Sequence, residues 1–137
     1  MLDKALWIAF NAHFDQLDKG GRPYILHPMT VALNVNTTDE KIVALLHDVI
    51  EDTSVTLDDL RKEGFPDNII EAVNVLTKRD GEDYESYLHR VKKNHLATTV
   101  KIADLKHNSD LSRLKEITDK DRKRAKKYAR SLDYLMG

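Results

Sequence analysis

Residues 42–53 read IVALLHDVIEDT, an aliphatic run that also carries one histidine and three carboxylates. The aliphatic residues predict a buried helix, but burying an unpaired charge costs on the order of several kcal/mol, so these groups need compensation. On a helix, residues i and i+4 lie on one face. Glu51 therefore lies one turn beyond His47, and in the same way Asp52 follows Asp48. The arrangement suits a divalent cation bound by the histidine and the first carboxylate, with the two later carboxylates available to handle water and protons.

A cation at this helix needs further ligands from elsewhere in the chain. His27 and Asp104 are the candidates, because each lies in an apolar stretch, ILHPMTVA and VKIADL. A single histidine beside a proline is more often a capping or core residue, and an aspartate on an amphipathic helix is usually solvated. The combination of both residues with the His47-Asp48 pair, each in an apolar setting, favours a shared metal site.

Helical spacing of apolar residues also recurs on both sides of this segment. The sequence shows no alternating strand pattern of useful length, no internal repeat and no low-complexity segment. We therefore predict an all-α fold, a single domain over residues 1–137 that forms a bundle of about seven or eight helices. The predicted helical segments are 2–17, a short stretch from His27 to about Asn34, 40–52, 56–63, 67–77, 83–93, 95–109 and 119–136.

The composition narrows the class of protein. The chain has 22 basic and 23 acidic residues, so it has no overall basic excess for nucleic acid or an anionic membrane. The basic run Arg122 to Arg130 is interleaved with apolar residues and diluted by aspartates, which favours a solvated helix face over a nucleic-acid patch. The lack of cysteine excludes disulfides and zinc–thiolate sites. Without a signal core or a run of about 18 apolar residues, we expect a cytoplasmic protein, either a monomer or a homodimer.

Three segments of the chain resemble the HD-domain metal-dependent phosphohydrolases, and among these the (p)ppGpp hydrolase domain of RelA/SpoT proteins and the small alarmone hydrolases. They are AHFDQLDKGGRPYILHP at 12–28, ALLHDVIEDT at 44–53 and VKIADLKHN at 100–108. Their motif elements follow the family's order, which is a more specific signal than one His-Asp pair. The similarity extends from about Ala12 to Leu114.

The resemblance implies a role for each matching residue. The implied ligands of one divalent metal ion, typically manganese in this family, are His27, His47, Asp48 and Asp104. The implied catalytic pair, which positions or deprotonates the attacking water, is Glu51 and Asp52. The implied nucleotide site includes Lys19, Tyr24, Lys101 and Asn108. Cations available to offset phosphate charge are Lys19, Arg22, Lys101, Lys106 and Arg113.

The implied reaction is attack of metal-activated water on the 3′-pyrophosphate of a guanosine tetra- or pentaphosphate, which releases pyrophosphate and GDP or GTP. The synthetase part of the long RelA/SpoT proteins has no counterpart here, so we expect no bifunctional enzyme. Asp18 and Asp110 stand where these hydrolases usually carry basic residues, and Leu105-Lys106 replaces a common Arg-Leu. These departures predict weaker binding of a tetraphosphate. Two alternatives therefore stay open: a phosphohydrolase for another nucleotide or nucleotide pyrophosphate, and a non-catalytic metal- or nucleotide-binding module.

Overall fold

The structure is a computed structural model that describes residues 1–114 and 116–137, with side chains given throughout that range except at Arg113. Within the described residues every regular element is a helix, apart from one isolated antiparallel bridge between Leu17 and Pro23. The prediction of an all-α fold is confirmed. The helices are α1 (Leu2–Ala12), α2 (Leu26–Leu33), α3 (Thr38–Leu46), α4 (Val49–Asp52), α5 (Leu57–Lys62), α6 (Asp67–Leu76), α7 (Tyr84–Lys92), α8 (His95–Asn108), the 3-10 helix η1 (Leu111–Arg113) and α9 (Asp119–Met136).

Two predicted helices end earlier than expected. The helix predicted over 2–17 ends at Ala12, and Asp15 in the following loop has a left-handed backbone with φ of 67°. The helix predicted over 40–52 is interrupted after α3, since His47 and Asp48 form the turn that leads into α4. The described part of the chain therefore contains nine α-helices instead of seven or eight.

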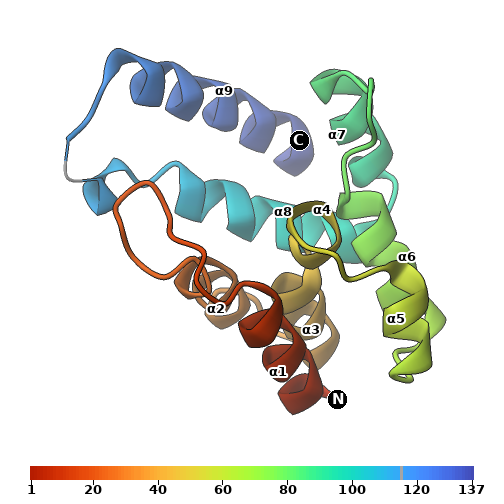
Figure 1. The fold of residues 1–137 in the computed structure, drawn as a ribbon. Coiled ribbons are helices and arrows are strands. Elements are labelled where there is room, and N and C mark those ends of the chain that lie inside the picture. Colours follow the sequence, from red (N-terminus) through yellow and green to blue (C-terminus); the bar gives the residue numbers. More distant parts are fainter. Residues whose placement is uncertain (115) are drawn as a thin grey trace.

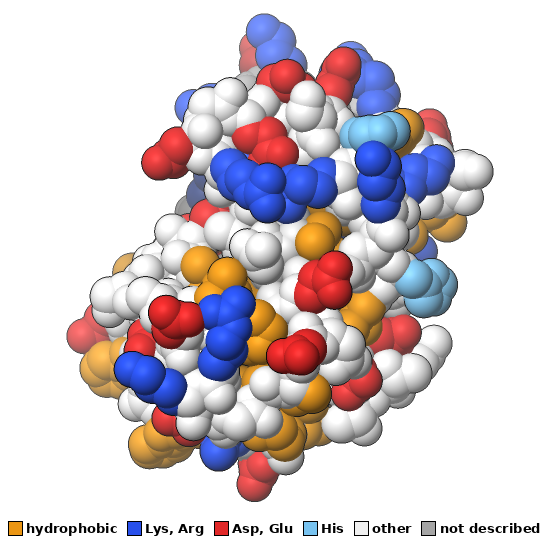
Figure 2. All heavy atoms as spheres, turned by 90° about the vertical axis from the view of Figure 1, so that its right-hand side faces the viewer, with side chains coloured by type: hydrophobic (Ala, Val, Ile, Leu, Met, Phe, Trp, Pro, Cys, Tyr) orange, Lys and Arg blue, Asp and Glu red, His pale blue; other side chains and the backbone are white. Residues whose placement is uncertain are grey.

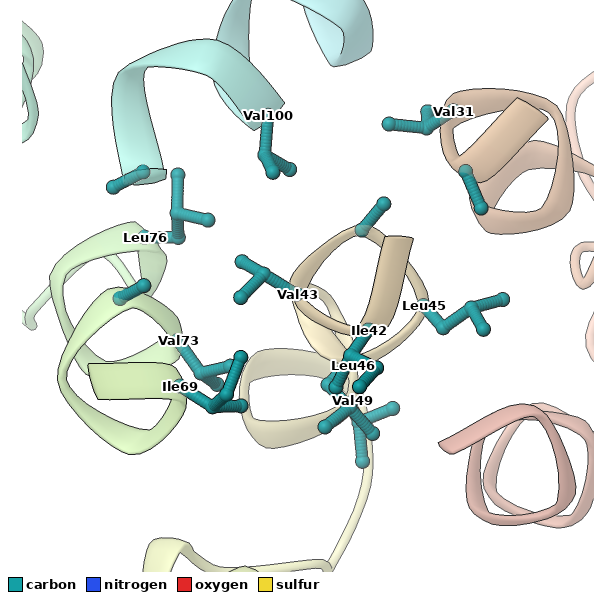
Figure 3. Packing of buried hydrophobic residues seen from close by; sticks show 14 of the residues in the cluster. Val31, Ile42, Val43, Leu45, Leu46, Val49, Ile69, Val73, Leu76 and Val100 are labelled. Atoms are coloured by element: carbon teal, nitrogen blue, oxygen red, sulfur yellow. The ribbon is translucent and has the colours of Figure 1, made fainter. Parts of the chain in front are cut away.

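Helix α3 is the centre of the fold, and it contains the first half of the stretch 42–53. All five residues from Ile42 to Leu46 are buried. The helix packs against α1, α2, α6 and α8, so that apolar side chains on every side of it meet a neighbour (Figure 3). A helix that is apolar all round is stable only in such a buried position. Burial of one leucine or isoleucine side chain contributes about 1.5–3 kcal/mol, so this helix supplies much of the core energy.

Helix α9 lies along α8 and also contacts α7, and it forms the upper layer in Figure 1. On the face shown in Figure 2, basic side chains form a band in the upper part, where α7 and α9 lie. Several basic residues of the run 122–130 are exposed, in agreement with a solvated helix face. Among the described helices, none combines the length and the apolar character that crossing a bilayer requires.

Candidate metal centre

Four ionisable side chains from three parts of the fold meet inside the protein. His27 lies in the first turn of α2, His47 and Asp48 lie between α3 and α4, and Asp104 lies in α8. One nitrogen or carboxylate oxygen from each of them lies within 4.8 Å of the others. Both histidines and Asp104 are buried, and Asp48 is half-buried. The structure thus brings together the four residues that the sequence singled out, although they are spread over 78 positions.

The hydrogen bonds of the two imidazoles indicate what this quartet can hold. The Nδ1 of His47 lies 2.5 Å from the carbonyl oxygen of Ala44, which can only accept, so Nδ1 carries the proton. In the neutral ring Nε2 is then an acceptor, and it faces Asp48 Oδ2 at 3.1 Å and Asp104 Oδ1 at 3.3 Å. His27 Nε2 lies 2.7 Å from the same Asp104 oxygen. Two acceptors that face each other at these distances are held by a positive charge between them, either a proton on Nε2 or a metal ion.

The pKa shifts of the quartet show the same attraction for positive charge. Burial would lower the pKa of His47, but the neighbouring Asp48 and Asp104 raise it well above its usual value. Burial would raise the pKa of Asp48, but His47 lowers it to about 2. The quartet therefore attracts positive charge strongly. Two imidazole nitrogens and two carboxylate oxygens fit a divalent transition metal better than Ca²⁺, which prefers oxygen ligands only.

Three of the predicted nucleotide-site residues hold the two carboxylates of the quartet in place. Tyr24 donates its hydroxyl hydrogen to Asp48 Oδ2 at 2.5 Å. Lys101 donates to Asp104 Oδ2 at 3.0 Å, and Asn108 donates to Asp104 Oδ1 at 3.3 Å. Such partners orient metal ligands and are a regular part of metal sites.

His107 also belongs to this network, and the sequence analysis assigned it no role. Its Nδ1 lies 2.7 Å from the Nδ1 of His27, and the two rings stack with an interplanar angle of 12°. One of these nitrogens donates and the other accepts. With the lone pair of His27 Nε2 directed at a metal ion, His27 Nδ1 would carry the proton and donate to His107. The spacing of three residues from Asp104, on the same helix face, is the signal that could have identified His107.

Glu51 and Asp52, the predicted catalytic pair, lie outside the ligand quartet and are exposed. Glu51 accepts a hydrogen bond from the backbone N–H of Lys78 at 3.2 Å. The carbonyl oxygen of Asp52 accepts from the side chain of Gln16 at 3.4 Å. Burial, and next the charge of Asp48, raises the pKa of both carboxylates. The charge of the quartet therefore reaches both carboxylates, and both are accessible to water.

A cavity of about 410 Å³ opens beside the quartet, and His27 forms part of its wall. The loop before α2 contributes Lys19 and Tyr24, and the end of α8 contributes Asn108. Three of the predicted nucleotide-site residues thus line one cavity. Lys101 does not line it. Of the other cations considered, Arg22 and Lys106 also lie outside this lining, and the side chain of Arg113 is outside the described part of the structure.

The third wall of the cavity comes from α9, which the sequence analysis interpreted as a solvated helix. Asp121, Arg124 and Tyr128 line the cavity from this helix. Their spacing of three and four residues places them on one helix face, opposite the solvated basic residues. Periodicity would have shown this shared face. Only the fold shows that the face turns toward the quartet.

The acidic residues of the cavity have local backbone partners. Asp18 accepts from the N–H groups of Gly20 and Arg22, at 2.8 and 3.0 Å. Asp110 accepts from the backbone and side chain of Ser112 at the start of η1. Asp18 and Asp110, the two departures from the hydrolase pattern, therefore hold the loops around the cavity in place. Both residues also line the cavity and give its wall negative charge.

Asp121 has a different environment from these two carboxylates. One of its oxygens accepts from Thr118, which caps α9. The other oxygen lies 3.9 Å from the Nζ of Lys19 and 3.9 Å from a guanidinium nitrogen of Arg124. Lys19 and Arg124, the cations that line the cavity among the described side chains, thus share one carboxylate.

An all-α fold that gathers two histidines and two aspartates beside an open cavity is the arrangement of an HD-type domain, and these four side chains could hold a metal ion. No model of a known protein family matches the chain. The chain is 33% identical over 122 residues to a probable GTP pyrophosphokinase of Mycobacterium leprae, covering 79% of this chain and 15% of that protein. It is 36% identical over 116 residues to a guanosine-3′,5′-bis(diphosphate) 3′-pyrophosphohydrolase of Haemophilus influenzae, covering 74% of this chain and 17% of that protein.

A third relative is the bifunctional (p)ppGpp synthase/hydrolase SpoT of Escherichia coli, 30% identical over 122 residues, covering 78% of this chain and 17% of that protein. This chain spans less than a fifth of the length of each of these three relatives. A solved structure described as a metazoan ortholog of SpoT that hydrolyzes ppGpp superposes with a TM-score of 0.81, at 25% identity, covering 99% of this chain and 85% of that one. The resemblance to the SpoT-type HD-domain hydrolases is thus confirmed in sequence and in fold.

Proposed function

We propose that this protein is a metal-dependent phosphohydrolase that converts ppGpp to GDP and pyrophosphate. The observation that carries this proposal is the convergence of His27, His47, Asp48 and Asp104 beside a cavity that His27 lines and that is large enough for a nucleotide. The similarity to proteins named as ppGpp 3′-pyrophosphohydrolases supports the substrate. The cysteine-free composition supports action in the cytoplasm.

The proposed chemistry divides between the quartet and the exposed pair. A divalent ion held by the quartet, Mn²⁺ in this proposal, would lower the pKa of a water molecule and polarise a phosphoryl oxygen. Glu51 and Asp52 would orient that water and accept its proton, because they lie one turn beyond the quartet and remain open to solvent. Tyr24 and Asn108 would keep the quartet carboxylates in position during this step.

The cavity offers contacts for both ends of a nucleotide. Lys19, from the loop before α2, and Arg124, from α9, would offset phosphate charge on either side of the carboxylate that they share, Asp121. Tyr128, together with leucines from η1 and the loop before α2, gives the cavity an apolar surface that suits a base. Lys101 would reach a phosphate only by leaving Asp104, so its role as a substrate contact depends on a rearrangement on binding.

A specific observation favours a second candidate function, hydrolysis of a nucleotide with fewer phosphates. Among the side chains that the structure describes, Asp18, Asp110 and Asp121 line the cavity against the cations Lys19 and Arg124. This balance disfavours a ligand with four or five phosphate groups. A non-catalytic binding module is disfavoured, because such a module has no need for the two exposed carboxylates beside the quartet.

The direct test is to incubate the purified protein with Mn²⁺ and ppGpp and to separate the products by anion-exchange chromatography. We expect GDP and pyrophosphate in equal amounts. The Arg124→Ala variant should raise KM by about 10- to 150-fold, since loss of a charge-assisted phosphate contact costs about 1.5–3 kcal/mol. Lys123→Ala is the matched control, because Lys123 is an exposed neighbour on α9 outside the cavity lining. Turnover of other nucleotides without pyrophosphate release from ppGpp would instead support the second candidate.

The carboxylate shared by the two cavity cations gives a separate prediction. Asp121→Asn removes the negative charge between Lys19 and Arg124, while its side-chain oxygen can still cap α9. We expect KM for ppGpp to fall by a factor of about three to ten, because the phosphates no longer compete with this carboxylate. Asp119→Asn, at an exposed position two residues earlier on α9, should leave KM unchanged. A higher KM in Asp121→Asn would contradict the placement of the phosphates near these cations.

A further inference from the structure

An apolar surface on α1, the following loop and α2 serves no purpose within the fold described above. Its six most prominent side chains are 44% to 80% exposed, and we call them the α1–α2 patch. The core-facing sides of both helices are already buried, through Ala5 and Ala9 on α1 and Val31 on α2. The patch consists of Trp7, Phe10, Phe14, Leu17, Leu26 and Leu33.

Several side chains of the patch adjoin one another across the two helices. Trp7, Phe10 and Phe14 follow one another along the outer side of α1 and the turn after it, and the last two rings lie 6.1 Å apart. Leu17 pairs through its backbone with Pro23, which leads into α2. A shallow groove between the helices is lined by Trp7, Phe10, Leu26 and Met29 among others. The groove therefore joins the exposed apolar side chains of α1 to those of α2.

The area of this patch exceeds what an isolated domain usually exposes. From the exposed fractions, its six side chains present roughly 800 Å² to solvent, whereas the largest apolar patch of a monomer is about 300–600 Å². A stable protein–protein interface buries about 800 Å² on each partner. Tryptophan and phenylalanine are also the residue types that contribute most to such interfaces. The patch alone thus has the size of one complete interface.

The charges around the patch indicate which partner fits. The segment 2–33, which carries the patch and its rim, contains three acidic residues (Asp3, Asp15 and Asp18) and three basic residues (Lys4, Lys19 and Arg22), so its side chains have no net charge. A membrane surface would require an excess of basic residues at the rim. A twofold axis brings a patch against its own copy, and a balanced rim is then self-complementary. We propose that the α1–α2 patch is the interface of a homodimer of this chain in solution.

The dimer would lie next to the candidate active site. Leu17 belongs to the patch and also lines the cavity beside the quartet. The proposal does not depend on the substrate, since it concerns a surface on the outer side of α1 and α2.

The protein has a single tryptophan, Trp7, which belongs to the patch and is 69% exposed in the monomer. Sedimentation velocity over a dilution series should give a species of twice 15.7 kDa at micromolar concentrations. Over the same range the fluorescence of Trp7 should shift to shorter wavelength and become less accessible to acrylamide. A monomer at all concentrations up to about 100 μM, a range in which specific interfaces of this size associate, would overturn the proposal.

Variants link the dimer to the patch and retain the tryptophan. The double variant Phe14→Ser, Leu33→Ser should weaken the dimer at least about 100-fold, as expected for loss of two central apolar contacts. Both side chains are exposed, so circular dichroism of the dilute variant should show an unchanged fold. Met136→Ser, at a position 63% exposed on α9, is the matched control and should leave the dimer intact. A dimer that survives in the double variant, or binding of the chain to neutral lipid vesicles through Trp7, would contradict this assignment.

Discussion

His47→Ala is expected to abolish hydrolysis, with a loss of at least about 10³-fold in kcat/KM, because it removes a buried ligand at the centre of the quartet. The remaining carboxylates Asp48 and Asp104 would then face each other with weaker compensation. The variant should also lose the response to metal that the wild type shows. For the wild type, Mn²⁺ at about 100 times its Kd should stabilise the fold by about 2.7 kcal/mol, through binding to the folded state alone.

The measurement is thermal unfolding with added Mn²⁺ and with EDTA, followed for wild type and variant together with activity. EDTA should lower the Tm of the wild type and leave the Tm of His47→Ala unchanged. The result to compare is the difference in Tm between Mn²⁺ and EDTA for each protein. The Tm of His47→Ala alone is not informative, because removal of a buried ring lowers it under both conditions. His95→Ala, an exposed histidine at the start of α8, is the control and should keep the full metal response. If neither EDTA nor Mn²⁺ changes the Tm of the wild type, the quartet is no metal site.

The double variant Glu51→Gln, Asp52→Asn is expected to lower kcat by about 10²- to 10⁴-fold, the range that general acid–base catalysis contributes. An amide cannot accept the proton of the attacking water. The substitutions should preserve the fold, because a glutamine oxygen can still accept the N–H of Lys78 and the backbone contact of Asp52 to Gln16 does not use the side chain. Metal binding should also remain, since neither residue belongs to the quartet.

The test compares kcat with the Tm shift on addition of Mn²⁺ for the double variant and both single variants. A low kcat with an unchanged Tm shift would separate the chemistry from metal binding, which the His47→Ala variant cannot do. Glu71→Gln, at an exposed position of α6, is a control for the change of charge. Activity of the double variant equal to wild type would show that this pair does not handle the proton.

Helical class and the composition of the quartet could be predicted from the sequence because both depend on local patterns. The apolar spacing within 42–53 indicates a buried helix, and a histidine and an aspartate inside it need a compensating cation. His27 and Asp104 raise the same question in their own apolar surroundings. Such patterns depend on the cost of burying charge, which does not depend on the arrangement of the helices.

Other features depend on how the helices pack. The turn at His47 and Asp48 interrupts what periodicity indicates to be one helix, because both side chains point toward Asp104 of α8. Because of this turn, Glu51 and Asp52 belong to the separate helix α4 and lie outside the quartet.

What the sequence by itself determined is the all-α class and the identity of the four residues that share a centre, since both follow from local spacing and from the energetics of buried charge. Only the tertiary structure decided that Arg124 and Tyr128 of α9 close the cavity, that His107 supports His27, and that the outer face of α1 and α2 stays exposed. The reason is physical. These relations join segments far apart in the chain, and the side of a helix that faces a neighbour is set by the packing of the whole core.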